Sequence, residues 1–116
     1  MKIGTRNDSI SLGASFDGAA MGIEFVDGYS VCASWTGGVG TLKIQACNNP
    51  FTDNVNMTPN PAAVWVDVPG SAVAVSGAGS QFWNVADAKY AGYRIVWTRS
   101  SSTGTLTAIH LIKGPQ

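Results

Sequence analysis

Residues 92–112, GYRIVWTRSSSTGTLTAIHLI, contain two β-rich runs on either side of a polar turn at residues 100–104. Valine, isoleucine, tryptophan, tyrosine and threonine fill both runs, and such runs around a short Ser/Gly-rich turn predict a β-hairpin. If Arg99 pairs with Gly104 across the turn, one face of the ribbon is apolar with polar tips. We expect this face to lie in the core, and it comprises Tyr93, Ile95, Trp97, Leu106, Ala108 and His110.

The opposite face of this predicted hairpin is also rich in apolar residues. Val96, Ile109 and Leu111 lie there, although a strand face in water normally shows polar alternation. A sheet face of this kind is seldom left in solvent. We therefore predict that Val96, Ile109 and Leu111 form an interface, covered either by a second copy of the chain or by the N-terminal segment around residues 8–16.

The composition of the whole chain favours an all-β fold. The 116 residues include 14 glycines, and only 12% are charged, whereas helices are usually filled with Glu, Lys and Leu. No segment keeps a helical period over three turns. Short strands with frequent turns predict a two-sheet antiparallel β-sandwich or jelly roll of about eight strands. We expect one domain, with residues 1–27 as an N-terminal arm and edge strands and residues 28–116 as the sandwich core.

Charge and hydropathy exclude several classes of partner. Seven basic and seven acidic residues give a net charge of zero, so the clustered Lys and Arg that bind DNA or RNA are missing and we expect no nucleic-acid partner. The first residues lack the apolar stretch of a signal peptide, and no run reaches transmembrane length. These patterns predict synthesis in the cytoplasm, without a signal peptide and without a membrane partner.

A second hairpin is predicted from residues 29–35 and 40–47. Pairing Trp35 with Gly40 places Cys32 and Cys47 on one face of the ribbon, ~13 Å apart along the strand. A disulfide needs Cα atoms within about 7 Å, so we predict two free thiols. Both hairpins contain Gly-Thr-Leu, at residues 40–42 and 104–106, which predicts equivalent strand pairs, one in each sheet.

The longest connection, residues 48–61, is rich in asparagine and proline. Loops of this length without regular structure are uncommon and usually functional. We therefore predict a binding or inter-subunit arm with Phe51 and Met57 at the interface. Its single carboxylate, Asp53, favours a network of Asx turns over a calcium site.

Trp65 follows this loop. Val64 and Val66 are expected in the core, which turns Trp65 outward together with Asp67. Such a tryptophan is either an aromatic platform for a sugar ring or is roofed by Phe51 or Met57 of the loop, and we favour the roofed arrangement.

The sequence offers little catalytic chemistry. His110, the single histidine, falls on the core face and is expected to be a hydrogen-bonded core residue rather than a base. Cys32 and Cys47 with one histidine are too few for structural zinc, and they lack Cys-x-x-Cys spacing. We predict that the protein is not an enzyme and uses neither a metal nor another cofactor.

Several motifs resemble those of one group of proteins. They are residues 34–37 (SWTG), 40–46 (GTLKIQA), 65–71 (WVDVPGS), 75–80 (VSGAGS), 83–85 (WNV) and 93–99 (YRIVWTR). The pattern, over residues 28–114, resembles small β-sandwich structural proteins of tailed phages and prophages, which have a discoidin-like jelly roll. The long Asn/Pro loop and the first thirty residues depart from it.

This resemblance implies a non-enzymatic virion component, such as a capsid decoration, tail or fibre-associated protein, that acts through protein–protein interfaces. Its implied partners are other virion proteins and further copies of itself, a trimer being slightly favoured over a dimer by analogy with virion parts. Its implied location is the virion. The alternative is a carbohydrate-binding jelly-roll module that contacts a glycan through Trp65, Asp67 and Asn54.

Overall fold

The computed structural model describes residues 2–23, 28–53, 56, 58–85 and 90–113, with the side chains of residues 2–6 and 113 not included. These ranges contain no helix, and hence none that would span a bilayer. They contain twelve strands: β1 Lys2–Ser11, β2 Phe16–Asp17, β3 Met21–Gly22, β4 Gly28–Trp35, β5 Val39–Cys47, β6 Phe51–Asp53, β7 Thr58–Pro59, β8 Val66–Asp67, β9 Val73–Ser76, β10 Gly79–Val85, β11 Gly92–Ser101 and β12 Thr105–Lys113.

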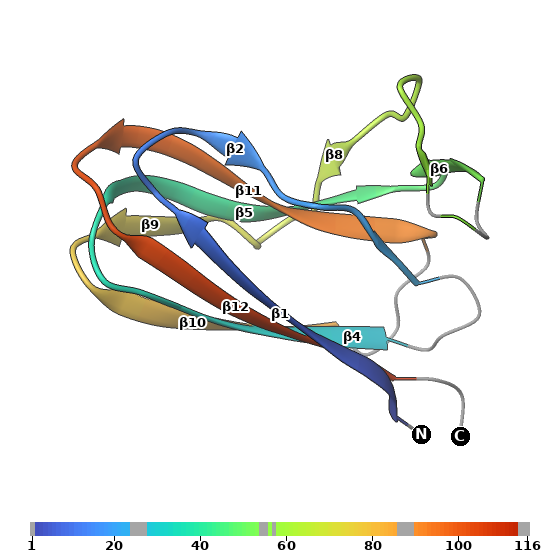
Figure 1. Cartoon of the computed structure of the whole chain (residues 1–116), viewed down its shortest axis with the longest axis horizontal. Helices are drawn as coiled ribbons and strands as arrows, with labels where there is room; N and C mark the ends of the chain where they lie inside the picture. The colour runs from blue at the N-terminus through green and yellow to red at the C-terminus, as the bar shows by residue number, and fades with distance from the viewer. Residues whose placement is uncertain (1, 24–27, 54–55, 57, 86–89, 114–116) are drawn as a thin grey trace.

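Two antiparallel sheets pack face to face, as Figure 1 shows. Sheet A has the strand order β1-β12-β4-β10. Sheet B has the order β2-β11-β5-β8, with β3 also paired to β11 and β9 to β5, while β6 and β7 form a separate ribbon. The predicted all-β antiparallel sandwich is confirmed. The strands outnumber the predicted eight or so because several, such as β2, β3, β7 and β8, are pairs of residues too short to leave a pattern.

The two predicted hairpins are wrong, because each connects one sheet to the other. β11 lies in sheet B and β12 in sheet A; β4 lies in sheet A and β5 in sheet B. Arg99 pairs with Gly40 of β5 rather than with Gly104, and Trp35 pairs with Leu106 of β12 rather than with Gly40. The predicted equivalent pairs therefore do not occupy one sheet each.

The faces assigned to these strands are nevertheless correct. Tyr93, Ile95, Trp97, Leu106, Ala108 and His110 are all buried. In an arch the two strands face one another across the core instead of lying side by side, and the period of two still decides which residues turn inward. The alternation therefore predicted correctly which residues face the core, although the predicted strand partners were wrong.

The arches gather at one end of the sandwich, where the β1–β2, β4–β5, β9–β10 and β11–β12 connections lie together (Figure 1). Thr36 N donates to Thr105 O at 3.1 Å, and Thr105 N donates to the Thr36 hydroxyl at 3.0 Å. A Cβ at Gly104 would lie 2.7 Å from the carbonyl carbon of Gly37, so the two arches come close enough to require glycine. Gly38 has a φ of 99°, which also favours glycine.

The N-terminal residues belong to the sandwich. β1 pairs with β12 from Lys2 to Ser11 and forms the edge of sheet A. Leu12 is fully buried, its N–H donates to Gly104 O at 2.8 Å, and its carbonyl accepts from Trp97 Nε1 at 3.2 Å. Met21 is also buried in the core. The predicted boundary at residue 27 falls among residues 24–27, which lie outside the described part of the chain.

Candidate interaction surface

Two well-exposed valines lie at the edge of sheet B, Val66 on β8 and Val64 just before it. Val64 and Val66 are 67% and 62% exposed, so the prediction that they enter the core is wrong. Only Val66–Asp67 form a strand, β8, and this pairs with Gln45 and Ala46 of β5. Because β8 is so short and lies at the edge of the sheet, the side chains of Val64 and Val66 are not covered by a second layer. We call Val64 and Val66 the valine edge.

A pocket of about 420 Å³ adjoins the valine edge. Its lining residues are Ala46, Cys47, Asn48, Asn49, Val64, Val66 and Tyr90. Pockets of this size hold small molecules or single side chains of a docked protein. The Asn49 side-chain oxygen already accepts from the Cys47 thiol at 3.0 Å and from Val64 N at 3.4 Å. The pocket therefore presents mainly apolar contact.

The long loop is held by its own asparagines. Asn60 Nδ2 donates to Asn49 O at 2.9 Å, and Asn60 Oδ1 accepts from Ala62 N at 2.9 Å. Asp53 accepts from the backbone and side chain of Asn56. This bonding confirms the predicted Asx network. The loop also contains the β6–β7 ribbon, with Phe51 half-buried, whereas Met57 and Asn54 lie outside the described residues.

Trp65 packs against a charged side chain, whereas the favoured roof by Met57 falls outside the described residues. The guanidinium carbon of Arg94 lies 4.4 Å from the centre of the Trp65 ring, which is a cation–π contact. Trp65 is half-buried, because Val64 and Val66 take the outward positions on either side of it. One face of the predicted sugar platform is therefore used by Arg94.

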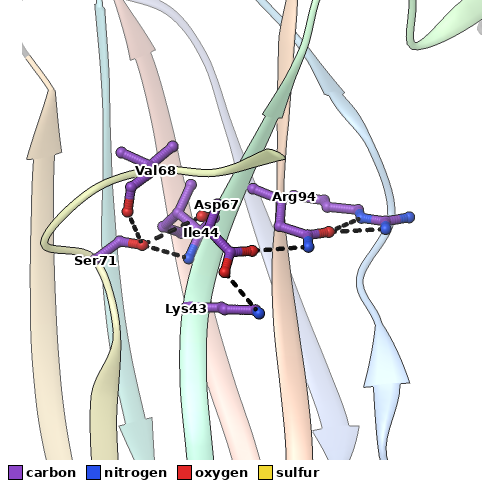
Figure 2. A network of polar contacts seen from close by, with 7 residues as sticks. Lys43, Ile44, Asp67, Val68, Ser71 and Arg94 are labelled. Atoms are coloured by element: carbon purple, nitrogen blue, oxygen red, sulfur yellow. Dashed lines mark hydrogen bonds and ion pairs between the residues drawn. The ribbon is translucent and has the colours of Figure 1, made fainter. Parts of the chain in front are cut away.

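Asp67 belongs to a polar network that crosses sheet B (Figure 2). Lys43 Nζ lies 3.0 Å from Asp67 Oδ2, and Gln45 Nε2 donates to Asp67 Oδ1 at 3.0 Å. Gln45 Oε1 accepts two bonds from Arg94, at 3.0 and 2.8 Å, and Arg94 Nη2 lies 3.7 Å from Asp17 Oδ2. The hydrogen bond from Gln45, and then the one from Lys43, hold the pKa of Asp67 below its usual value. The network gives sheet B an outer face of alternating charges.

Ser71 fixes the connection that follows β8, as Figure 2 also shows. Its hydroxyl donates to Val68 O at 2.7 Å, contacts Ile44 O at 3.2 Å and accepts from Ile44 N at 3.1 Å. Ser71 N also donates to Val68 O at 3.1 Å, and Gly70 has a φ of 78°. Proline then glycine at the two central positions is the type II turn pattern. This turn holds β8 and the valine edge beside β5.

The predicted interface of Val96, Ile109 and Leu111 is not one surface. Val96 is 7% exposed on sheet B, where β2 and β5 flank it. Ile109 and Leu111 lie on β12 of sheet A, on the opposite side of the sandwich. The prediction fails because it placed β11 and β12 in one sheet.

Sheet A has an outer face that the sequence did not reveal. The register aligns Asn7, Ile109, Cys32 and Phe82 in one row across its strands. Ile109 and Phe82 are exposed large apolar side chains, and the Cys32 thiol between them is exposed. The sequence alone does not predict this row, because its members come from four separate strands and only the strand register aligns them. Cys47, in contrast, is buried on β5, and both cysteines are free as predicted.

His110 is a buried, hydrogen-bonded core residue, as predicted. Its Nδ1 lies 2.8 Å from the Tyr93 hydroxyl, and its Nε2 lies 3.1 Å from Asp8 Oδ2. Tyr93 stacks on Tyr29 with ring centres 3.7 Å apart. His110 and Tyr93 are at most 2% exposed, so this chain of polar groups joins the two sheets out of reach of a substrate. Within the described ranges, no three His, Cys, Asp or Glu side chains are grouped to hold a metal ion.

Comparisons with known proteins include a weak likeness to a pilus protein. No protein-family profile and no curated protein matches the chain. Among solved structures, it is similar to a protein of Bacillus endospore appendages, described as a novel family of disulfide-linked pili. The two chains share 16% identity and a TM-score of 0.36, over 99% of this chain and 92% of the other.

Proposed function

We propose that the protein is a non-enzymatic structural component of a tailed-phage particle and acts through protein–protein interfaces. The observation that carries this proposal is the valine edge, where two well-exposed valines stand beside an apolar pocket. Exposed apolar surface of this kind is typical of sites where another protein docks. The phage setting is supported by the resemblance of residues 28–114 to virion sandwich proteins.

A protein side chain fits the pocket better than a sugar does. Sugar sites combine an open aromatic face with polar groups free to bind hydroxyls. Here Arg94 lies over Trp65, and the Asp67 oxygens are bonded to Lys43 and Gln45. The valine edge offers apolar contact, so we expect its occupant to be an apolar side chain of another particle protein.

The test is incorporation into particles purified from cells that encode the protein. We expect mass spectrometry to detect the wild-type chain in these particles, and the double substitution Val64→Glu with Val66→Glu to remove it. Ala74→Glu, at an exposed position of β9 in the same sheet, is the matched control and should be incorporated normally. Because all three side chains are exposed, the melting temperatures should stay close to that of the wild type.

Two results would count against the proposal. The wild-type chain would be absent from purified particles, or the double variant would be incorporated as well as the control. A glycan array gives an independent comparison: binding of one sugar class that Trp65→Ala abolishes would favour a carbohydrate-binding module instead.

A further inference from the structure

The outer face of sheet A carries no charged group among its described side chains. Its outward positions on β1, β12, β4 and β10 form three rows across the sheet. Serine, threonine and asparagine dominate, with a few large apolar residues between them. The described members are Ser9, Thr107, Ser34 and Ser80; Asn7, Ile109, Cys32 and Phe82; and Leu111, Ser30 and Asn84.

The outer face of sheet B is the opposite in character. Asp17, Lys43, Asp67 and Arg94 project from it and are joined in the network described above. In the described part of the chain, charge is therefore concentrated on one side of the sandwich. A charged face has to lose hydration when it is covered, whereas the face of sheet A can be covered without desolvating any described charge.

The middle row of sheet A is self-complementary. Cys32 lies between its two large apolar members, with Phe82 on one neighbouring strand and Ile109 on the other. A two-fold axis that passes beside Cys32 brings the two copies of this thiol together. With the axis parallel to the strands, Phe82 of each copy meets Ile109 of the other; with the axis across the strands, like residues meet. Both arrangements place apolar side chains against apolar side chains.

We propose that a second copy of this chain docks on the outer face of sheet A, with a two-fold axis beside Cys32. This inference rests on the proposed function in one respect: both treat the protein as a component of an assembly. The second copy is the occupant because it supplies a face of the same size, with uncharged described side chains and the matching middle row. Two such sheets pack about 10 Å apart, so that their side chains interdigitate.

The size of the face predicts a weak dimer. Strands spaced about 4.8 Å apart, with about eight residues at 3.4 Å each, give a footprint of about 500 Å². Standard interfaces bury about 800 Å² per partner, so this contact lies toward the low end of specific ones. We expect association that depends on protein concentration and that covalent trapping reveals most clearly.

The first experiment is cross-linking with a short bis-maleimide under reducing conditions. We expect the wild-type chain and Cys47→Ser to give a covalent dimer, and Cys32→Ser to give none. The matched control moves the thiol to the charged face, as Thr98→Cys in the Cys32→Ser background. Thr98 is exposed on sheet B, so chance collisions would trap it as well as Cys32. Efficient trapping through Cys32 alone supports the proposal, and equal trapping through residue 98 overturns it.

The second experiment places a charge in the middle row. Phe82 is 60% exposed, so Phe82→Lys should leave the melting temperature of the monomer nearly unchanged. It should raise the dimer dissociation constant roughly tenfold or more, because an unpaired ammonium would be buried at the contact. Analytical ultracentrifugation over a range of concentrations measures this shift. A wild type that stays monomeric at several hundred micromolar, or an unchanged constant for Phe82→Lys, would overturn the proposal.

These outcomes are separate from those for the proposed function. A chain that is found in particles through the valine edge but does not dimerise would refute only the sheet A contact. A chain that dimerises through Cys32 but never enters a particle would refute only the phage role.

Discussion

Leu12→Ala tests whether the N-terminal segment is part of the core. Leu12 is fully buried, and its side chain lies beside Gly38 and Trp97. Burying a leucine side chain is worth about 1.5–3 kcal/mol, and the cavity left by truncation raises the usual cost to about 2–5 kcal/mol. A domain of this length typically has a free energy of unfolding of roughly 6–17 kcal/mol. We therefore expect urea titration followed by tryptophan fluorescence to show a loss of about 3 kcal/mol with an unchanged m-value.

The matched control is Val64→Ala, which shortens an aliphatic side chain that is 67% exposed. It should change the free energy of unfolding by no more than about 0.5 kcal/mol. A Leu12→Ala loss below about 1 kcal/mol would refute the packing of this residue, because a buried leucine cannot be truncated at so small a cost. The segment around Leu12 would then lie on the surface of the sandwich rather than in its core.

Three further predictions follow from the described contacts. In dilute folded protein Cys32 should react quickly with a maleimide and Cys47 only after unfolding, and mass spectrometry that finds two adducts formed at equal rates would contradict this. Burial, and then the hydrogen bond with Tyr90, raises the pKa of Tyr29, so the folded chain keeps a proton that the unfolded chain releases above pH ~10. Stability should fall as pH rises beyond that point, and Tyr29→Phe should reduce this slope by up to about 1.4 kcal/mol per pH unit in urea titrations; an unchanged slope would refute the assignment. Ser71→Ala should cost about 1–3 kcal/mol in the same assay through its lost buried hydrogen bonds, and a change below about 0.5 kcal/mol would mean that the turn does not depend on them.

The inward faces of the strands were predictable because alternation is a local property. Residues 93–97 alternate large apolar side chains with smaller or polar ones, and this period alone places Tyr93, Ile95 and Trp97 in the core. The burial and bonding of His110 followed from the same parity. Nothing about neighbouring strands was needed for these predictions.

Strand partners were not predictable in the same way. A short polar turn between two β-rich runs has almost the same composition whether the strands pair with each other or cross between sheets. The difference lies in contacts between arches: Gly37 approaches Gly104, and Thr36 bonds to Thr105. These pairs are far apart in the sequence, so the local sequence pattern around each turn favours a hairpin. The repeated Gly-Thr-Leu was the available clue, because each copy begins the strand that leaves an arch.

The valine edge was mispredicted for a related reason. Alternate residues of 63–68 face opposite sides of the strand, so either Trp65 or the two valines could point inward. We assigned the valines inward because they are apolar. The structure turns Trp65 toward Arg94 instead, a contact that depends on β11 lying two strands away from β8. A cation–π contact and the cross-sheet bonds of Asp67 outweigh the burial of two small aliphatic side chains at an edge that no second layer covers.

The distribution of charge also depends on register. Composition shows that few residues are charged, but only the strand order shows that Asp17, Lys43, Asp67 and Arg94 gather on sheet B, where β8, β5, β11 and β2 bring opposite charges together. The described side chains of the outer face of sheet A are uncharged, and a surface of serine, threonine and apolar residues loses little hydration energy when another sheet covers it. The same low charge, from which we expect no nucleic-acid partner, thus favours contact between protein surfaces. For this chain, the position of its few charges is more informative about function than their number.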